Sequence, residues 1–332
     1  MIQISVIIPT YNEEGYIRDC IDSVLESTLN KDSYEVLLID GGSNDNTKSI
    51  IQHYVNTFTN ITFYHNPKQY APVAFNMGIE NAAGKYLMIL GAHSKISANY
   101  IEEAVKFLEE NSEVDVVGGV LKNKGFTPVS KAIANAMSSP FGVGGAKFRT
   151  GNFSGFVETV AFGVYRKEIF QSVGLFNENL IRAQDGEMNH RIKKSGRKIY
   201  LLNDIYAEYI VRSSFKKLFR QYFQYGYWKV VLNVMNRSFV SVRQLVPFFF
   251  VGLVFLWPFT LLASMDLFFV FSALILLHLL ASILTSFRFR GSIKVKFFTL
   301  ISFYILHISY GIGYAKGILD FVIFRKKYAA SK

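Results

Sequence analysis

The hydrophobic positions in the first 120 residues form two alternating patterns. Short uninterrupted apolar runs, typical of strands buried on both faces, each end at a polar or glycine-rich loop. The strands predicted from these runs are 4–8, 34–40, 61–64, 86–90 and 114–119. Apolar residues at helical spacing lie between the runs and predict helices over 16–25, 73–83 and 99–108, the last capped by Asn99. This alternation predicts a doubly wound α/β domain with a mostly parallel sheet.

The segment EVLLIDGGSNDNT, residues 35–47, shows most clearly how such a strand ends. Asp40 follows the apolar run, and the small residues at 41–43 let the backbone approach a ligand closely. Residues 44–47 are expected to form the turn and cap of a following helix. Ligands of open α/β sheets bind outside the carboxyl ends of the strands, so Asp40 is a candidate nucleotide contact. The alternative for this loop alone is an aspartate that only caps its own turn.

Three long uncharged stretches occupy the end of the chain. Residues 245–265 and 267–287 are each long enough to cross a hydrocarbon core of ~30 Å, and the short link between them predicts a helical hairpin. The third stretch covers about residues 297–315 and is interrupted by glycines. The link between the second and third stretches is basic. If the third stretch crosses the membrane, the basic residues 325–327 lie on the opposite side from this link, which conflicts with the positive-inside rule. A re-entrant or interfacial segment avoids that conflict, and both alternatives stay open.

The distribution of charge favours a membrane over nucleic acid as a partner. The 332 residues carry a formal charge of +11, and half of them are apolar, which is high for an ordinary soluble enzyme. Thirteen Lys and Arg but only four acids lie between Arg182 and Arg243, directly before the apolar stretches, where anionic lipid would meet them. Residues 215–234 are aromatic on one side and basic on the other, which predicts a helix in the membrane interface.

The compartment of the N-terminal domain is expected to be the cytosol. A single cysteine, Cys20, excludes a disulfide framework and suits a reducing environment. No basic segment precedes the first apolar run, which argues against a signal peptide.

Six segments, in a fixed order, resemble a known enzyme family. They read SVIIPTYNEE, LLIDGGSNDNT, AFNMGIENAAGKYLMILGAH, VAFGVYRKEIFQSVGLFNENL, RAQDGEMNHRIKKSGRKI and RSSFKKLFRQYFQYGYWK. Over roughly residues 3–240 they resemble the family 2 inverting glycosyltransferases, whose catalytic domain has the GT-A fold. Among subfamilies, they look most like the succinoglycan-type, membrane-associated glucosyltransferases of bacterial exopolysaccharide assembly.

The resemblance implies a domain order and an activity. The implied parts are a Rossmann-like GT-A domain over 1–214, an interfacial helix region over 215–244, a membrane domain over 245–324 and a basic tail over 325–332. The implied enzyme lies at the inner membrane of the cell with its catalytic domain in the cytosol. It would move a sugar from a nucleotide diphosphate sugar, expected to be a UDP-sugar, to a polyprenyl-diphosphate-linked saccharide, with inversion. The expected partners are this donor, the lipid-linked acceptor and membrane lipid, and no nucleic acid. The alternatives are transfer to polyprenyl phosphate itself and a catalytically weakened nucleotide-binding scaffold.

The resemblance also implies which residues bind the donor. The expected contacts with the nucleotide sugar are Pro9, Tyr11, Glu13, Asp40, Asn76 and Ala92. Of these, Tyr11, Glu13 and Asp40 would contact the base and the ribose. Gly41 stands where the family often has a second aspartate, so one polar contact is expected to be missing.

The metal site is where this chain departs most from the family pattern. In the family, an Asp-x-Asp or Asp-x-His motif holds Mg²⁺ or Mn²⁺ at the pyrophosphate of the donor. The resemblance places this motif at Gly91-Ala92-His93, in which His93 offers a ring nitrogen and Gly91 offers no ligand atom. One imidazole is a poor site for Mg²⁺, which prefers oxygen ligands. Three interpretations stay open: a metal held mainly by the phosphates and His93, an enzyme that needs no metal, and a weakened enzyme.

Asp185, in the segment RAQDGE, matches the catalytic aspartate of the family at the start of a helix. A single displacement needs one carboxylate within ~3 Å of the proton that it removes from the acceptor. The alternative is an acid that only caps the helix. The residues expected to support this base or bind the acceptor are Gln184, Glu187, Arg191 and Trp228. For Arg191 the alternative is a solvated helix face. Trp228 ends the segment QYGYW, and the tyrosine before it replaces the arginine of processive synthases, which argues against processive synthesis.

Overall fold

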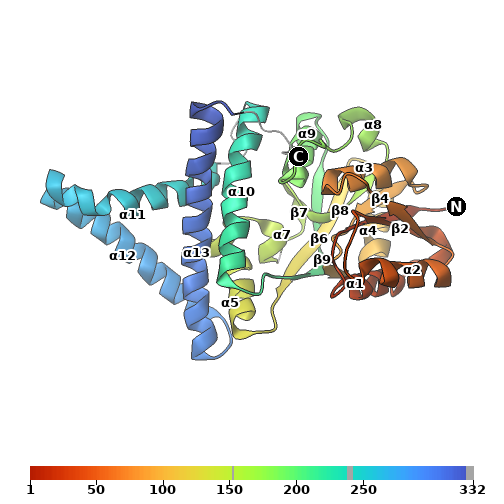
Figure 1. The fold of residues 1–332 in the computed structure, drawn as a ribbon, viewed down its shortest axis with the longest axis horizontal. Helices are drawn as coiled ribbons and strands as arrows, with labels where there is room; N and C mark the ends of the chain where they lie inside the picture. Colours follow the sequence, from red (N-terminus) through yellow and green to blue (C-terminus); the bar gives the residue numbers. More distant parts are fainter. Residues whose placement is uncertain (152, 238–241, 327–332) are drawn as a thin grey trace. The chain divides into compact units, whose positions relative to one another are not determined.

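The computed structural model describes residues 1–151, 153–237 and 242–326. Within these ranges the chain forms two compact units (Figure 1). The first comprises the described residues of Met1–Lys122 and Lys147–Ile210, and the second comprises Asn123–Ala146 together with residues 211–237 and 242–326.

A mixed sheet of nine strands forms the centre of the first unit, in the order β3-β2-β1-β4-β8-β6-β9-β5, with β7 paired to β9. The strands are β1 (Ile4–Thr10), β2 (Tyr34–Asp40), β3 (Ile61–His65), β4 (Tyr86–Ile89), β5 (Ser94–Ile96), β6 (Val116–Lys124), β7 (Gly155–Phe156), β8 (Ala161–Arg166) and β9 (Ile199–Ile210). β1, β2, β3 and β4 pair in parallel, as their apolar runs predicted. β4 pairs antiparallel with β8, β8 with β6, and both β5 and β7 with β9. The α/β class is therefore confirmed, but the sheet is mixed, because β5, β7, β8 and β9 add an antiparallel half that the sequence pattern did not predict.

Helices cover both faces of this sheet. They are α1 (Ile17–Leu25), α2 (Thr47–Thr57), α3 (Ala71–Asn81), α4 (Tyr100–Glu110), α7 (Lys147–Thr150), α8 (Ile169–Val173) and α9 (Gln184–Lys194), with a short 3-10 helix η1 (Lys31–Ser33). Figure 1 shows α3 on one side of the parallel strands and α1 and α2 on the other. Apolar residues of α3, α8 and α9 form one core with Ile7, Leu37 and Val116 of the sheet. Asn99 occupies the N-cap position of α4, as predicted, but its side chain donates to the Asp204 carbonyl (3.4 Å) and forms no cap hydrogen bond with the helix.

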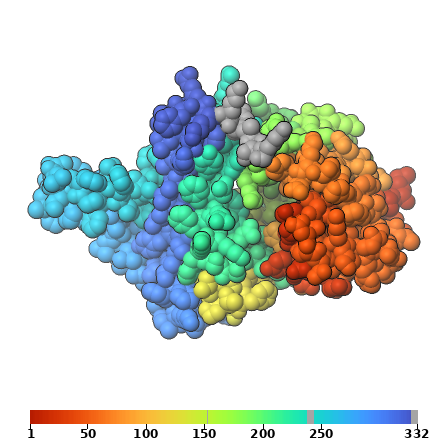
Figure 2. All heavy atoms as spheres, viewed as in Figure 1, coloured from red at the N-terminus to blue at the C-terminus, as the bar shows by residue number. Residues whose placement is uncertain are grey.

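The second unit is helical. Its helices are α5 (Pro128–Met137), α6 (Pro140–Val143), α10 (Phe215–Asn236), α11 (Val246–Ala263), α12 (Met265–Arg288) and α13 (Ile293–Gly317), with a 3-10 turn η2 (Val242–Leu245) and a π-helical turn η3 (Ile318–Ile323). α11, α12 and residues 293–323 are long and apolar enough to cross a membrane. Almost no residue of α11 or α12 is buried, and Figure 2 shows this hairpin projecting from α10 and α13. An apolar surface of this kind is what lipid would cover.

The third apolar stretch forms a continuous helix, although glycines interrupt its apolar sequence. The glycines lie where neighbouring helices come close. A Cβ atom on Gly313 would lie 2.1 Å from the Phe223 carbonyl oxygen of α10, and one on Gly311 would lie 2.3 Å from the Pro247 carbonyl oxygen of α11. Small residues at such positions let helix backbones approach each other. The glycines of α13 therefore serve helix packing.

α10, predicted as an interfacial helix, packs along α13. Its buried side includes Leu218, Tyr222 and Val230 at helical spacing. α5 and α6 also pack against α13, and the Asn135 side chain of α5 donates to the Thr299 hydroxyl (3.3 Å). Residues 123–146 therefore pack with the long helices, although the sequence placed them inside the predicted 1–214 domain.

Candidate functional site

Two strand-end loops are joined at the carboxyl edge of β1 and β2. The amide of Asn12 donates to the Ser43 hydroxyl (2.9 Å), and the Asn12 side-chain oxygen accepts from the amide of Asn44 (2.9 Å). The amide of Glu13 donates to the Thr47 hydroxyl (2.8 Å). Asn12 can take part because its φ of 55° lies in the left-handed region, which asparagine tolerates better than most residues. The bonds fix the two predicted donor loops relative to each other.

Asp40 is fully buried at the end of β2, and its carboxylate holds its own loop. One oxygen accepts from the amides of Gly42 (2.9 Å) and Ser43 (3.0 Å), and the other accepts from the hydroxyls of Ser43 and Thr10. With these hydrogen bonds Asp40 caps its own turn, which was the alternative to a nucleotide contact. A direct contact between Asp40 and a nucleotide stays a prediction, and its visible role is to shape the loop.

Gly41 has a packing reason for lacking a side chain. A Cβ atom there would lie 3.1 Å from the carbonyl oxygen and 3.3 Å from the Cα atom of Gln69. Gln69 itself has a left-handed φ of 65°. The backbone of the segment before α3 therefore occupies the space that a second aspartate would need.

The other predicted donor contacts at this edge differ in exposure. Pro9 is half-buried in β1, whereas Tyr11 exposes 46% of its surface. Ala92 is buried after β4, so only its backbone could reach a ligand. Of these three residues, Tyr11 is therefore the one whose side chain is available to a base.

Asn76 supports a neighbouring segment of the protein. Its side-chain amide donates to the Phe176 carbonyl (2.9 Å), and its side-chain oxygen accepts from the Phe176 amide (2.9 Å). The same amide also reaches Glu178 (3.3 Å), whose ion pair with Lys68 lowers the pKa of the Glu178 carboxyl. The buried Asn76 thus ties α3 to the 176–178 segment, and donor binding by this side chain stays a prediction.

His93 is oriented by Glu13. The Nδ1 atom of His93 lies 3.2 Å from a carboxylate oxygen of Glu13, and 30% of the His93 side chain is exposed. A carboxylate only accepts, so Nδ1 carries the hydrogen and the lone pair of a neutral imidazole lies on Nε2. A histidine oriented by a carboxylate in this way is typical of a metal ligand. The ring also packs edge-on against Tyr209 of β9 (5.3 Å between centroids).

Gly91 is bordered by the Phe162 ring and by the Ser94 hydroxyl, and it offers no side-chain ligand of its own. A Cβ atom on Gly91 would lie 3.2 Å from the ring of Phe162, which has a left-handed φ of 48°. The Gly91 carbonyl accepts from the Cys20 thiol (3.7 Å), and burial raises the pKa of that thiol, which keeps it protonated. Across the described residues, no three His, Cys, Asp or Glu side chains lie together as a metal site. The described side chains of these four types therefore form no complete metal site at His93, and we expect a metal here to need the donor's phosphates as further ligands.

Asp185 lies in the first turn of α9 with an exposed side chain. Within the described chain no hydrogen bond to its carboxylate is formed, and the surrounding protein removes part of its hydration and raises its pKa. Burial and, to a lesser extent, the charge of Asp185 raise the pKa of Tyr165 in β8. An accessible carboxylate with a raised pKa suits a general base.

The backbone before α9 is strained. Ala183 has φ 62° and ψ 22°, a left-handed conformation that is costly for a residue with a Cβ atom. The side chain of Gln184 donates to the Ile181 carbonyl (2.7 Å), which fixes the turn that carries Asp185. Gln184 therefore supports the predicted base through the backbone.

Glu187 and Arg191 form a structural ion pair. Both carboxylate oxygens of the buried Glu187 accept from the Arg191 guanidinium (2.7 and 2.8 Å). Arg191 also donates to the carbonyls of residues 173–175. The solvated helix face considered for Arg191 is wrong, since this arginine joins α9 to the end of α8. Trp228 belongs to the second unit, where its indole donates to Gln224 (3.0 Å).

Two residues near His93 were missed by the sequence analysis. Tyr209 packs on His93, and the Arg149 guanidinium lies 6.0 Å from the centroid of the same Tyr209 ring. Arg149 and His93 therefore lie near the same tyrosine ring. No motif pointed to either residue, because β9 and α7 lie in segments for which the pattern predicted no element.

The sequence matches a family model and several curated proteins. Residues 5–174 match the model described as Glycosyl transferase family 2. The chain is 35% identical over 254 residues to a Methanococcus voltae protein, covering 74% of this chain and 78% of that protein. That protein is named dolichyl N-acetyl-alpha-D-glucosaminyl phosphate 3-beta-D-2,3-diacetamido-2,3-dideoxy-beta-D-glucuronosyltransferase. The chain is also 30% identical over 244 residues to succinoglycan biosynthesis protein ExoA of Rhizobium meliloti, covering 73% of each protein.

Solved structures show the same fold. S. aureus TarS 1–349 in complex with UDP aligns with a TM-score of 0.51 at 20% identity, covering 67% of this chain and 64% of that one. GalNAc-T7 with UDP, GalNAc and Mn²⁺ aligns with a TM-score of 0.50 at 18% identity, covering 64% of this chain and 44% of that one. The chain thus spans just under two thirds of the TarS chain that it matches. At these identities the likeness concerns the fold alone, and it confirms the predicted GT-A domain.

Proposed function

The chain belongs to glycosyltransferase family 2, and we propose that it transfers one sugar from a UDP-sugar to a lipid-linked saccharide with inversion of the anomeric centre. The observation that carries the proposal is Asp185 at the start of α9, whose exposed carboxylate forms no hydrogen bond or ion pair with the described residues. It belongs to the same unit as the loops that follow β1, β2 and β4. A base and a set of donor loops on one fold are what a single displacement requires.

The chemistry assigned to Asp185 is removal of a proton from the acceptor hydroxyl. The oxygen of that hydroxyl then attacks the anomeric carbon of the donor sugar. The bond between this carbon and the diphosphate oxygen breaks on the opposite face, and UDP leaves with the bonding electron pair. Attack opposite to the leaving group gives the inverted anomer, and Asp185 ends the step protonated.

The donor half of the proposal rests on the loops joined by Asn12 and Asp40. Tyr11 offers an exposed ring to the nucleotide base. Glu13 contacts the Nδ1 atom of His93, so this contact does not involve Nε2. A divalent metal that arrives with the donor would neutralise part of the charge on the leaving diphosphate. His93 is the protein ligand that we assign to such a metal. Arg149 would add a positive charge on the same side.

The proposal of a lipid-linked acceptor rests on the helices of the second unit and on the names of two similar proteins. The name of the Methanococcus voltae protein describes transfer to a sugar that is already linked to dolichyl phosphate, and ExoA is named for succinoglycan biosynthesis. Three helices able to cross a membrane would keep this chain where a polyprenyl-linked acceptor lies. We assign the catalytic domain to the cytosolic face of the inner membrane, and the basic link between α12 and α13 supports this assignment through the positive-inside rule.

Product analysis tests this proposal. Purified full-length protein is incubated with a panel of UDP-sugars and with polyprenyl-diphosphate-linked saccharides, and the lipid product is examined by NMR. We expect release of UDP together with one new glycosidic bond of the inverted configuration. Retention of configuration, or a product in which the sugar is joined directly to polyprenyl phosphate, would contradict it.

A nucleotide-binding scaffold is the second candidate, and Gly91 is the observation that favours it. The loss of an acid at the metal motif, with Phe162 against the vacant position, would weaken catalysis without removing the donor loops. UDP binding by calorimetry with no turnover of any UDP-sugar, including hydrolysis, would support the scaffold over the transferase.

A further inference from the structure

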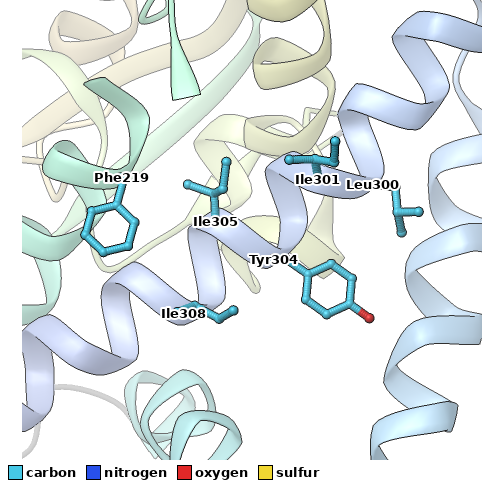
Figure 3. A pocket seen from close by; sticks show the side chains of 6 residues that line it. All are labelled: Phe219, Leu300, Ile301, Tyr304, Ile305 and Ile308. Carbon is cyan, nitrogen blue, oxygen red and sulfur yellow. The ribbon is translucent and has the colours of Figure 1, made fainter. Parts of the chain in front are cut away.

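An apolar groove crosses the face of α13 beside α10 in the second unit (Figure 3). Its volume is ≈ 340 Å³. The residues that line it are Phe219, Leu300, Ile301, Tyr304, Ile305 and Ile308. Five of the six come from one stripe of α13, and Phe219 of α10 closes one side. The Tyr304 hydroxyl is the only polar side-chain group among them, so the groove suits a branched hydrocarbon.

One end of this groove lies next to a cluster of positive charges. α10 and α13 begin side by side, since the rings of Phe215 and Phe298 are 5.6 Å apart. Phe219 lies one helical turn beyond Phe215, so the groove starts about 5 Å along the axis from this end. The exposed basic side chains of this end, on the first turns of α10 and on the link into α13, are Lys216, Lys217, Arg220, Arg288, Arg290 and Lys294. No acid lies among residues 215–223 or 288–296.

We propose that this groove binds the first isoprene units of a polyprenyl phosphate or diphosphate lipid, whose phosphate lies against the basic end. The inference deepens the proposed function, on which it rests, by locating the lipid of the acceptor on this chain. A polyprenyl phosphate combines a branched apolar chain with a multiply charged head, and the groove and the basic end present the complementary surfaces in that order. Lysine and arginine near a membrane surface attract anionic lipid by about 1 kcal/mol each, which holds the head at this end.

Photocrosslinking of the full-length protein tests the groove without any donor or sugar. The protein is placed in nanodiscs of phosphatidylcholine with a C55 polyprenyl phosphate that carries a diazirine in its second isoprene unit. A phosphatidic acid with a diazirine in its acyl chain serves as the comparison lipid. We expect the polyprenyl probe to label residues 300–308, and unlabelled C55 polyprenyl phosphate to compete while phosphatidic acid does not. Equal labelling by the acyl probe would mean that ordinary lipid fills the groove and would overturn the proposal.

Two tryptophan variants provide the matched comparison. Leu300→Trp fills the groove, whereas Leu284→Trp adds the same bulk to α12 at a position that is 65% exposed and outside the groove. We expect Leu300→Trp to lower labelling about tenfold and Leu284→Trp to leave it within about twofold. Equal effects of the two would overturn the assignment. If Leu300→Trp does not fold, as judged by loss of UDP binding, Ile308→Trp repeats the test at the other end of the groove.

The outcomes separate this inference from the proposed function. Specific labelling of the groove without sugar transfer would support lipid binding in the groove and contradict the proposed transferase activity. If sugar transfer to a C55-linked acceptor is observed and Leu300→Trp does not change it, the transferase activity is supported and lipid binding in the groove is contradicted. Replacing Lys216, Lys217 and Arg220 together by glutamine should weaken binding of the phosphate probe but not of uncharged polyprenol. An equal loss for both probes would contradict the assignment of the head group.

Discussion

Replacing Asp185 by asparagine separates its proposed role from a role in folding. The substitution keeps the shape of the side chain and removes its ability to accept a proton. Because no described residue hydrogen-bonds to the Asp185 carboxylate, the change breaks no hydrogen bond among the described residues. Loss of a general base typically lowers the rate ~10²–10⁴-fold. We therefore expect kcat to fall in this range while the Kd for UDP stays within about twofold.

Stability provides the second readout for this variant. The pKa of Asp185 is raised in the folded protein, so the charged form is disfavoured by folding. When the pKa of an acid is higher in the folded than in the unfolded protein, its charged form lowers stability at pH values above the folded pKa. This penalty disappears as the pH falls below the unfolded pKa. Asp185→Asn removes this penalty, so the Tm at neutral pH should stay the same or rise slightly. A fall in Tm together with the fall in activity would show that the residue acts through folding.

The pH dependence of turnover tests the same assignment. A base works only when deprotonated, so kcat/KM should fall with a slope of one as the pH drops through the raised pKa of Asp185. This acid limb should lie above the range of an ordinary aspartate and should be absent from the residual activity of Asp185→Asn. The control is Asp204→Asn, another exposed acid of the same unit. Transfer by Asp185→Asn at more than a third of the wild-type rate would refute the reasoning.

Three further predictions test the metal, the ion pair beside the base and the helix packing. Wild type should bind Mn²⁺ weakly in calorimetry without UDP and more tightly with it, and His93→Ala should remove that increase; micromolar binding without UDP would contradict the single-ligand site. Glu187→Gln leaves the half-buried Arg191 charge unpaired and should cost about 3 kcal/mol, seen as a lower Tm; an unchanged Tm would contradict this. Gly313→Ala should loosen α10 from α13 and increase tryptic cleavage, whereas Gly252→Ala, with open space around its Cβ position, should not; equal cleavage would refute the packing role.

The parallel half of the sheet could be predicted from sequence because its strands are buried on both faces. Residues 36–39 form an uninterrupted apolar run, residues 4–8 are apolar except for Ser5, and almost every residue of β1 and β2 is buried. β9 is different, because its twelve residues alternate between buried and accessible positions and include the exposed Asn203 and Asp204. β5 and β7 have only three and two residues, too few for any period to show. These strands exist through their partners in the sheet, which the local sequence does not contain.

The candidate site divides in a similar way. Asp185 and His93 were found because a motif carries them at a fixed place in the chain. Asn76 and Arg191 were also found, but their hydrogen bonds run to backbone atoms of residues 173–176, which are distant in sequence. A motif gives the identity of such a residue and not its partner. The structural role became visible only when the partners were placed.

Gly41 and Gly91 show that the two departures from the family pattern are part of the packing. At each position a Cβ atom would make a tight contact, 3.1 Å from the Gln69 carbonyl oxygen in one case and 3.2 Å from the Phe162 ring in the other. Both occupying residues have left-handed backbone conformations, which are costly and persist only where the surrounding contacts impose them. Restoring an acid at position 91 alone would therefore have to move Phe162 by a few tenths of an ångström before the new carboxylate could reach a metal. An acid at either position therefore needs a neighbouring residue to shift, so we expect any metal at position 91 to depend on His93 and the donor rather than on a restored acid.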